Sequence, residues 1–180
     1  MRTTRPRAGI VVPLAVAIVV VAVTWGSGWT VTGAAATPID VATGLSVRSP
    51  DGWSATTAAL PPPWRGVRLV RGPDVVTVAG ADEVGGSPVD VLDAYVEQVL
   101  RAQLRVSVLS EMGSITLPSG RQAVTVGYLG TSFEGIPLEG LAIAFLGGPG
   151  GVVFDAVAPK GELGAIADDL RSLVESAEVA

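Results

Sequence analysis

Few residues of this 180-residue chain can carry out chemistry, because it contains neither cysteine nor histidine. Their absence excludes disulfide frameworks, thiolate nucleophiles, zinc sites with the usual ligand sets and imidazole acid–base relays. A serine nucleophile would have only Lys160 as its base. This lysine follows Pro159, a position more typical of a surface residue at the start of a helix. We therefore predict no catalytic residue.

Carboxylates and glycines form further patterns that can bind ions or phosphates. Asp82–Glu83 and Asp168–Asp169 are adjacent acids, and paired acids can hold a hard cation. Neighbours on a helix point about 100° apart, however, and neither pair belongs to a calcium-loop motif. Residues 147–151 lack the lysine and the hydroxyl residue of a phosphate loop, so they indicate a turn. We predict surface acids, no metal ion and no cofactor.

Three arginines spaced three residues apart are the remaining candidates for anion binding. Arg65, Arg68 and Arg71 lie around a predicted strand, and such a group can grip a carboxylate or a phosphate. The two-residue period of a strand puts Arg68 on the face opposite the other two, which favours edge-strand charges that discourage aggregation. Trp64 precedes them in a proline-rich loop that we expect on the surface. Trp64 and Arg65 are therefore the candidate partner-binding residues.

The N-terminal segment predicts insertion into a membrane. Residues 1–7 contain three arginines, and no further charged residue precedes Asp40. The 18 residues from Ala8 to Trp25 would span about 27 Å as a helix, close to the thickness of the hydrocarbon core. We predict a cytoplasmic basic tail at 1–7 and a transmembrane helix or signal segment at 8–29, with everything after it outside the cell.

The end of this segment leaves two outcomes open. Trp25 and Trp29 lie where the aromatic belt of a retained anchor would sit, so we assign both to the membrane interface. The small residues around Ala36 are also typical of a signal-peptide cleavage site. The protein is thus a single-pass membrane protein with its C-terminal domain outside, or a secreted protein that is cleaved near Ala36.

Beyond a linker at 30–42, residues 43–180 predict one extracytoplasmic α+β domain. A proline-aspartate-glycine turn at 50–52 predicts an opening hairpin between 45–49 and 53–58. A capped, amphipathic pattern predicts one helix at 87–103, and a second apolar stripe predicts another from Leu163. Period-two patterns predict further strands at 67–70, 75–79, 106–109, 114–117, 122–129, 136–146 and 152–158. The predicted fold is an antiparallel β-sheet with two covering helices.

The opening hairpin resembles that of a known fold. The run Gly44-Leu45-Ser46-Val47, followed by Pro50-Asp51-Gly52-Trp53, is similar to the start of PsbP-like α/β/α sandwich domains, which include exported bacterial DcrB-like and LpqN-like proteins. The resemblance covers most of residues 43–178 in outline. It implies an antiparallel sheet between helices and an accessory or binding role in the cell envelope. It implies no catalytic residue.

Charge and composition limit the partners of this domain. Three of the 12 basic residues precede residue 30, so nine basic and all 17 acidic residues remain beyond it, a formal net charge of −8. Such a domain is repelled by nucleic acid and by anionic lipid. Arginine strongly outnumbers lysine, and alanine, glycine and valine are abundant, as is typical of high-GC bacteria such as actinobacteria.

The predicted function is that of a membrane-tethered, non-enzymatic accessory or binding domain of the bacterial cell envelope. It would meet an envelope protein partner through its sheet edge or through the loop at 61–64. Two alternatives stay open. One is a carboxylate-dependent hydrolase of the cell envelope, and the other is a carrier of a small apolar ligand, which requires an enclosed cavity between sheet and helix.

Overall fold

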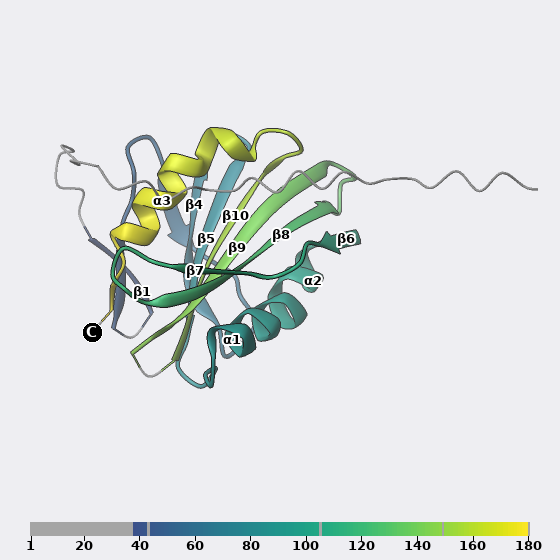
Figure 1. The fold of residues 1–180 in the computed structure, drawn as a ribbon. Helices are drawn as coiled ribbons and strands as arrows, with labels where there is room; N and C mark the ends of the chain where they lie inside the picture. Colours follow the sequence, from purple (N-terminus) through teal and green to yellow (C-terminus); the bar gives the residue numbers. More distant parts are fainter. Residues whose placement is uncertain (1–37, 43, 105, 149, 180) are drawn as a thin grey trace, which may run out of the picture.

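A computed structural model describes residues 38–42, 44–104, 106–148 and 150–179, and Figure 1 follows them from the first strand to the last. The predicted basic tail, the predicted membrane span with Trp25 and Trp29, and the cleavage site near Ala36 all lie outside these residues. Within the described part, no helix has both the length and the hydropathy to cross a membrane.

Long strands with alternating burial form the centre of the domain. They make an eight-stranded sheet in which every pair of neighbours is antiparallel. Along the sheet, the order is β3 (Ser54–Thr57), β4 (Arg65–Arg71), β5 (Asp74–Ala81), β10 (Gly150–Pro159), β9 (Pro137–Gly147), β8 (Gln122–Thr131) and β6 (Val106–Leu109), and β7 (Gly113–Thr116) also pairs with β8. The predicted strands are therefore confirmed; β4, β5, β8 and β10 are two or three residues longer than expected, and β9 is shifted by one residue.

One face of this sheet is covered by the first predicted helix. It consists of α1 (Pro88–Tyr95), a π-helical stretch η1 (Val96–Leu100) and the short α2 (Arg101–Gln103). Its start has the expected cap, because the hydroxyl of Ser87 accepts a hydrogen bond from the backbone N–H of Asp90. Its apolar stripe is buried against the sheet. We call this side of the sheet the α1 face.

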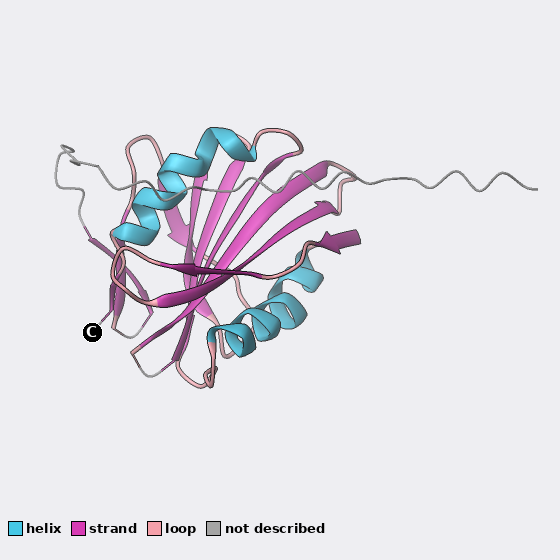
Figure 2. Cartoon of the chain, viewed as in Figure 1, coloured by secondary structure: helices cyan, strands magenta, loops and turns pink. Residues whose placement is uncertain are grey.

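The opposite face is covered by the second predicted helix and by a small second sheet. The helix consists of η2 (Leu163–Ile166) and α3 (Ala167–Glu175), and the three-stranded sheet has the order β1 (Pro38–Ala42), β2 (Leu45–Arg48) and β11 (Glu178–Val179). Figure 2 shows α1 and α3 on opposite sides of the central strands. We call this side the α3 face, and its core contains Trp53, Phe145 and Phe154.

The predicted opening hairpin is wrong. β2 pairs with β1 and β11, whereas β3 pairs with β4, so the turn at 50–52 connects two different sheets. Burial explains the choice of partners: β2 buries Leu45 and Val47 in the core of the α3 face, while all four residues of β3 are exposed. The fold also begins earlier than expected, because β1 occupies the end of the range assigned to a linker.

The glycine-rich segment at 147–151 is a hairpin turn, as predicted, but most of it belongs to strands. β9 extends through Gly147 and β10 starts at Gly150, and these two residues pair with each other. A Cβ atom at Gly150 would overlap the backbone of Ala81 on the neighbouring strand. Glycine is needed there because β5 and β10 come close together.

Candidate functional site

Trp64, a candidate partner-binding residue, is buried, so the expectation that its ring lies on the surface is wrong. Its side chain is 3% exposed. The indole N–H donates a hydrogen bond of 2.9 Å to Oε1 of Gln98, and the ring packs edge-on against Tyr95 at a centroid distance of 5.2 Å. Arg65, the other candidate, is exposed at the start of β4. The loop reaches the surface, but its aromatic ring turns inward under α1.

The three arginines do not form one anion site. Arg71 lies on the α3 face, where it makes an ion pair of 2.6 Å with Asp169 and covers the ring of Trp53. Arg68 points to the α1 face, as the strand period predicted. Its Nε atom is buried and has no hydrogen-bond partner among the described residues. Its backbone position lies in one row with Thr77 and Asp155 on the next two strands.

Asp155 is the main polar feature of the core, although it belongs to none of the acidic pairs in the sequence. Its side chain is 1% exposed. The hydroxyl of Tyr128 donates a hydrogen bond of 2.6 Å to Oδ1, and that of Tyr95 donates one of 3.0 Å to Oδ2. These are the only two tyrosines in the chain. They reach the carboxylate from β8 and α1, so it joins the sheet to its helical cover.

Burial dominates the electrostatics of this cluster. Loss of hydration raises the pKa of Asp155 to about 6, although the hydrogen bonds from Tyr128 and Tyr95 and the charge of Arg68 act in the opposite direction. Burial and the nearby carboxylate raise the pKa values of Tyr95 and Tyr128 well above their ordinary range. Both tyrosines therefore stay protonated and continue to donate. The cluster can bind the helix to the sheet, but substrate cannot reach a carboxylate this deeply buried.

The other acidic residues do not form a reactive pair. Asp82, Glu83 and Asp168 are exposed, as predicted. Asp168 and Asp169 form separate ion pairs, with Arg171 and Arg71 respectively. Among the described residues, no group of three or more acids is placed to hold a metal ion. Lys160 is exposed at the turn that leads from β10 toward η2.

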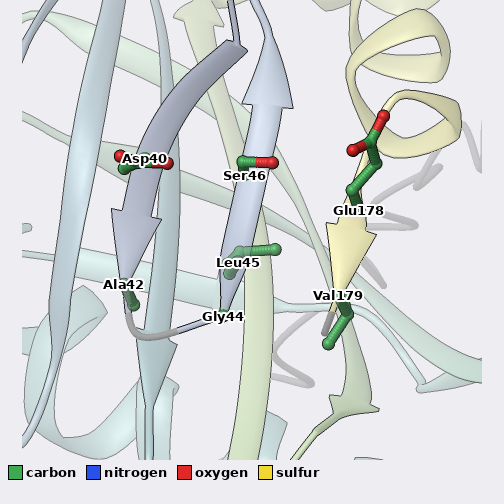
Figure 3. Close-up of a pocket in the computed structure, with 7 residues that line it drawn as sticks. All are labelled: Asp40, Ala42, Gly44, Leu45, Ser46, Glu178 and Val179. Atoms are coloured by element: carbon green, nitrogen blue, oxygen red, sulfur yellow. The ribbon is translucent and has the colours of Figure 1, made fainter.

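An open cleft of about 650 Å³ lies on the small sheet rather than between sheet and helix. Figure 3 shows Asp40, Ser46 and Glu178 side by side on its three strands. The strand register places both acids directly opposite Ser46, and Glu178 already makes an ion pair with Arg48. This cleft is open and is lined by both polar and apolar side chains, unlike the enclosed apolar cavity that a carrier of small apolar ligands requires.

On the edge strand β3, two residues have backbone N–H and C=O groups without a hydrogen-bond partner among the described residues. The N–H of Ala58 donates to the carbonyl of Gly66 in the extension of the β3–β4 ladder. Because hydrogen bonding alternates along an antiparallel pair, Ser54 and Thr56 also face β4, whereas the N–H and C=O groups of Ala55 and Thr57 point away from it. All four side chains of β3 are exposed and uncharged, and none is proline.

The opposite edge of the sheet is protected in ways that β3 is not. There β6 and β7 are separate short strands, and Ser110 between them fills the gap by hydrogen bonding twice to Gly127 of β8. The charged Glu111 is exposed in the same connection. Breaks and charges of this kind prevent strands from adding to an edge. In the part of the chain that the structure describes, β3 is protected only by its shortness, so it is the candidate interaction surface.

Comparisons with known proteins agree with the fold. No protein-family model matches the chain, and no curated protein sequence matches it. The structure is similar to cyanobacterial PsbP (CyanoP) from Synechocystis sp. PCC 6803, with a TM-score of 0.57 and 15% identity, over 86% of this chain and 99% of that chain. It is also similar to LpqN of Mycobacterium tuberculosis, a protein involved in cell envelope biogenesis, with a TM-score of 0.52 and 16% identity, over 83% and 87% of the two chains. The chain therefore has a PsbP-like fold.

Proposed function

We propose that this chain is a membrane-tethered accessory domain of the bacterial cell envelope that binds a protein partner through the open edge of β3. The observation that carries the proposal is the outward direction of the backbone groups of Ala55 and Thr57 on a strand without charge or proline. Such an edge can accept an extended strand from another protein, which supplies main-chain hydrogen bonds.

The location is supported by the N-terminal pattern. Three arginines followed by an apolar stretch of about the bilayer thickness favour a retained anchor with the folded domain outside. LpqN, whose fold is similar, is involved in cell envelope biogenesis, and this supports an envelope role here. Cleavage near Ala36 would release the same domain and leave its binding edge unchanged.

A catalytic role has no comparable support. Asp155, a carboxylate whose pKa is raised by burial, lies between two tyrosine hydroxyls. A hydrolase that uses two acids needs both of them at a cleft that admits a polymer. The cleft of the small sheet has Asp40 and Glu178 on its two outer strands, with Ser46 on the strand between them. Nothing there favours glycoside hydrolysis over a solvated surface.

Photo-crosslinking in intact cells tests this proposal. A photoreactive amino acid replaces Thr57 on the open edge in one strain and Ser119 in the exposed turn before β8 in a matched control strain. The proposal expects a discrete protein adduct from position 57, several-fold stronger than any adduct from position 119. Equal or absent adducts at both positions, with both variants present at wild-type levels, would contradict it.

A further inference from the structure

We infer that the occupant of the β3 edge is a second copy of this chain, paired antiparallel about a two-fold axis that passes beside Thr56. This inference rests on the proposed function and names the partner at the same edge. The two eight-stranded sheets would continue into each other through β3, so the interface is isologous.

The backbone of β3 matches its own two-fold image. In this register, Ala55 of each copy lies opposite Thr57 of the other, and these are the residues whose N–H and C=O groups point outward. Both pairs therefore exchange reciprocal hydrogen bonds. Thr56 then faces Thr56 of the second copy as a non-hydrogen-bonded pair. The side chains that meet are small and uncharged, so the two edges bring no like charges together.

The segments before and after β3 leave room for the second copy. Trp53 belongs to the core of the α3 face, while Leu60 and Trp64 pack into the core of the α1 face. The chain therefore reaches β3 from one side of the sheet and leaves it on the other. The two-fold axis places the segment before β3 of one copy next to the loop after β3 of the other. These two segments do not collide, because they lie on opposite faces of the joined sheet.

Charge is complementary at both ends of the paired strands. In the same register, Trp53 of one copy lies opposite Ala59 of the other. The β3–β4 register, continued by the hydrogen bond from Ala58 to Gly66, puts Arg65 at the level of Ala59 on the next strand. Asp51 lies in the turn just before Trp53, so each copy places this exposed acid at the end of the paired strands where its partner exposes Arg65. The two opposite charges meet at both ends by symmetry. It favours this register over one shifted along the strand.

The predicted membrane anchors also fit this arrangement. A two-fold axis between antiparallel strands runs perpendicular to the sheet, so both copies keep their α3 faces on the same side. β1 packs on that face, because a Cβ atom at Gly80 would touch Ala42. Both chains therefore enter the domain, at Pro38, from one side of the joined sheet. The eight residues 30–37 can extend by at most about 28 Å. Two anchored copies would therefore both keep this side of the joined sheet toward the same membrane.

Cysteine crosslinking of the full chain tests the inference, because the natural protein has no cysteine. Thr56→Cys places one thiol on the two-fold axis, where the Cα atoms of a non-hydrogen-bonded pair lie about 4.5 Å apart, within the range that a disulfide spans. Ser114→Cys places an equally exposed thiol on β7, at the other edge of the sheet. Both variants are expressed in intact cells, oxidised mildly and separated on non-reducing gels.

The inference expects a disulfide-linked dimer of Thr56→Cys in several-fold excess over that of Ser114→Cys. Adding Ala55→Pro, which removes an outward N–H but no bond to β4, is expected to abolish it, and so is adding Thr57→Lys. Equal dimer from the two cysteines would show random collision and overturn the inference. Absence of the Thr56→Cys dimer, while position 57 still photo-crosslinks to a different protein, would overturn the second copy as partner but leave the proposed function standing. Absence of both signals would overturn both.

Discussion

The hydroxyl oxygen of Tyr128, on β8, lies 2.6 Å from Oδ1 of Asp155, on β10, across the intervening strand β9. Tyr128→Phe removes this donor and leaves the buried carboxylate with Tyr95 alone. We expect the variant to lose about 1.5–3 kcal/mol of unfolding free energy, the range for a hydrogen bond to a charged group. Urea unfolding at pH 7.5 measures it, with the exposed Gln122→Ala as control. A loss no larger than that of the control would show that the bond contributes little.

Stability should rise as the pH falls through about 6, because of Asp155. Burial raises its pKa from 3.8 to about 6 in the folded protein, whereas the unfolded chain keeps the ordinary value. Between these values the folded state binds more protons, so protonation favours folding, by at most on the order of 3 kcal/mol. Urea unfolding between pH 7.5 and 4.5 measures the slope. Asp155→Asn should remove most of it, and an unchanged slope in that variant would assign the effect to other groups.

Gly140 on β9 is required by the ring of Tyr128. A Cβ atom at this position would overlap the phenol ring, so Gly140→Ala must displace Tyr128 from Asp155. Overpacking of this kind destabilises by about 1–3 kcal/mol, and a lower Tm in thermal unfolding should report it. Gly164→Ala is the matched control, since a Cβ atom there meets open space. Equal Tm values for the two variants would mean that the ring can move aside freely.

Replacing Trp64 should lower the free energy of unfolding far more than replacing its neighbour Arg65. Trp64→Ala empties a packed site under α1 and removes the partner of Gln98, so we expect a loss of about 3–5 kcal/mol. Arg65→Ala changes an exposed side chain and should stay within about 0.5 kcal/mol of the wild type. Chemical unfolding of both variants measures the two changes in unfolding free energy. A small effect of Trp64→Ala would indicate that its ring contributes little to the core.

Elements that are determined by neighbouring residues in the chain could be predicted from the sequence. The cap at Ser87 and the apolar stripe after it predicted the first helix, and period-two patterns predicted the strands at 67–70 and 75–79 that form the β4–β5 hairpin. Strand partners are chosen by burial between distant segments, so β2 and β3 were wrongly paired with each other. The prolines at 61–63 predicted that this loop lies at the surface. They do not determine the direction in which the Trp64 side chain points.

The cluster around Asp155 does leave a signal in the sequence, in the residues that flank it. Asp155 is the only charged residue between Glu139 and Lys160, in a run that is otherwise apolar or glycine. A carboxylate in such a strand must be buried with donors, and the chain offers two tyrosines for that role. Which groups would meet it depends on the order of strands across the sheet, and this order is not a local property.

The accessibility of β3 in living cells tests most directly whether a partner covers this edge of an exported domain. Thr57→Cys and Ser119→Cys are each exposed to a membrane-impermeant maleimide, first in intact cells and then as dilute purified protein. We expect rapid labelling of position 119 in both settings, and labelling of position 57 that is several-fold slower in cells than in the purified protein. Equal rates at the two positions in cells would contradict a bound partner on β3, and no labelling of either position in cells would contradict export of the domain.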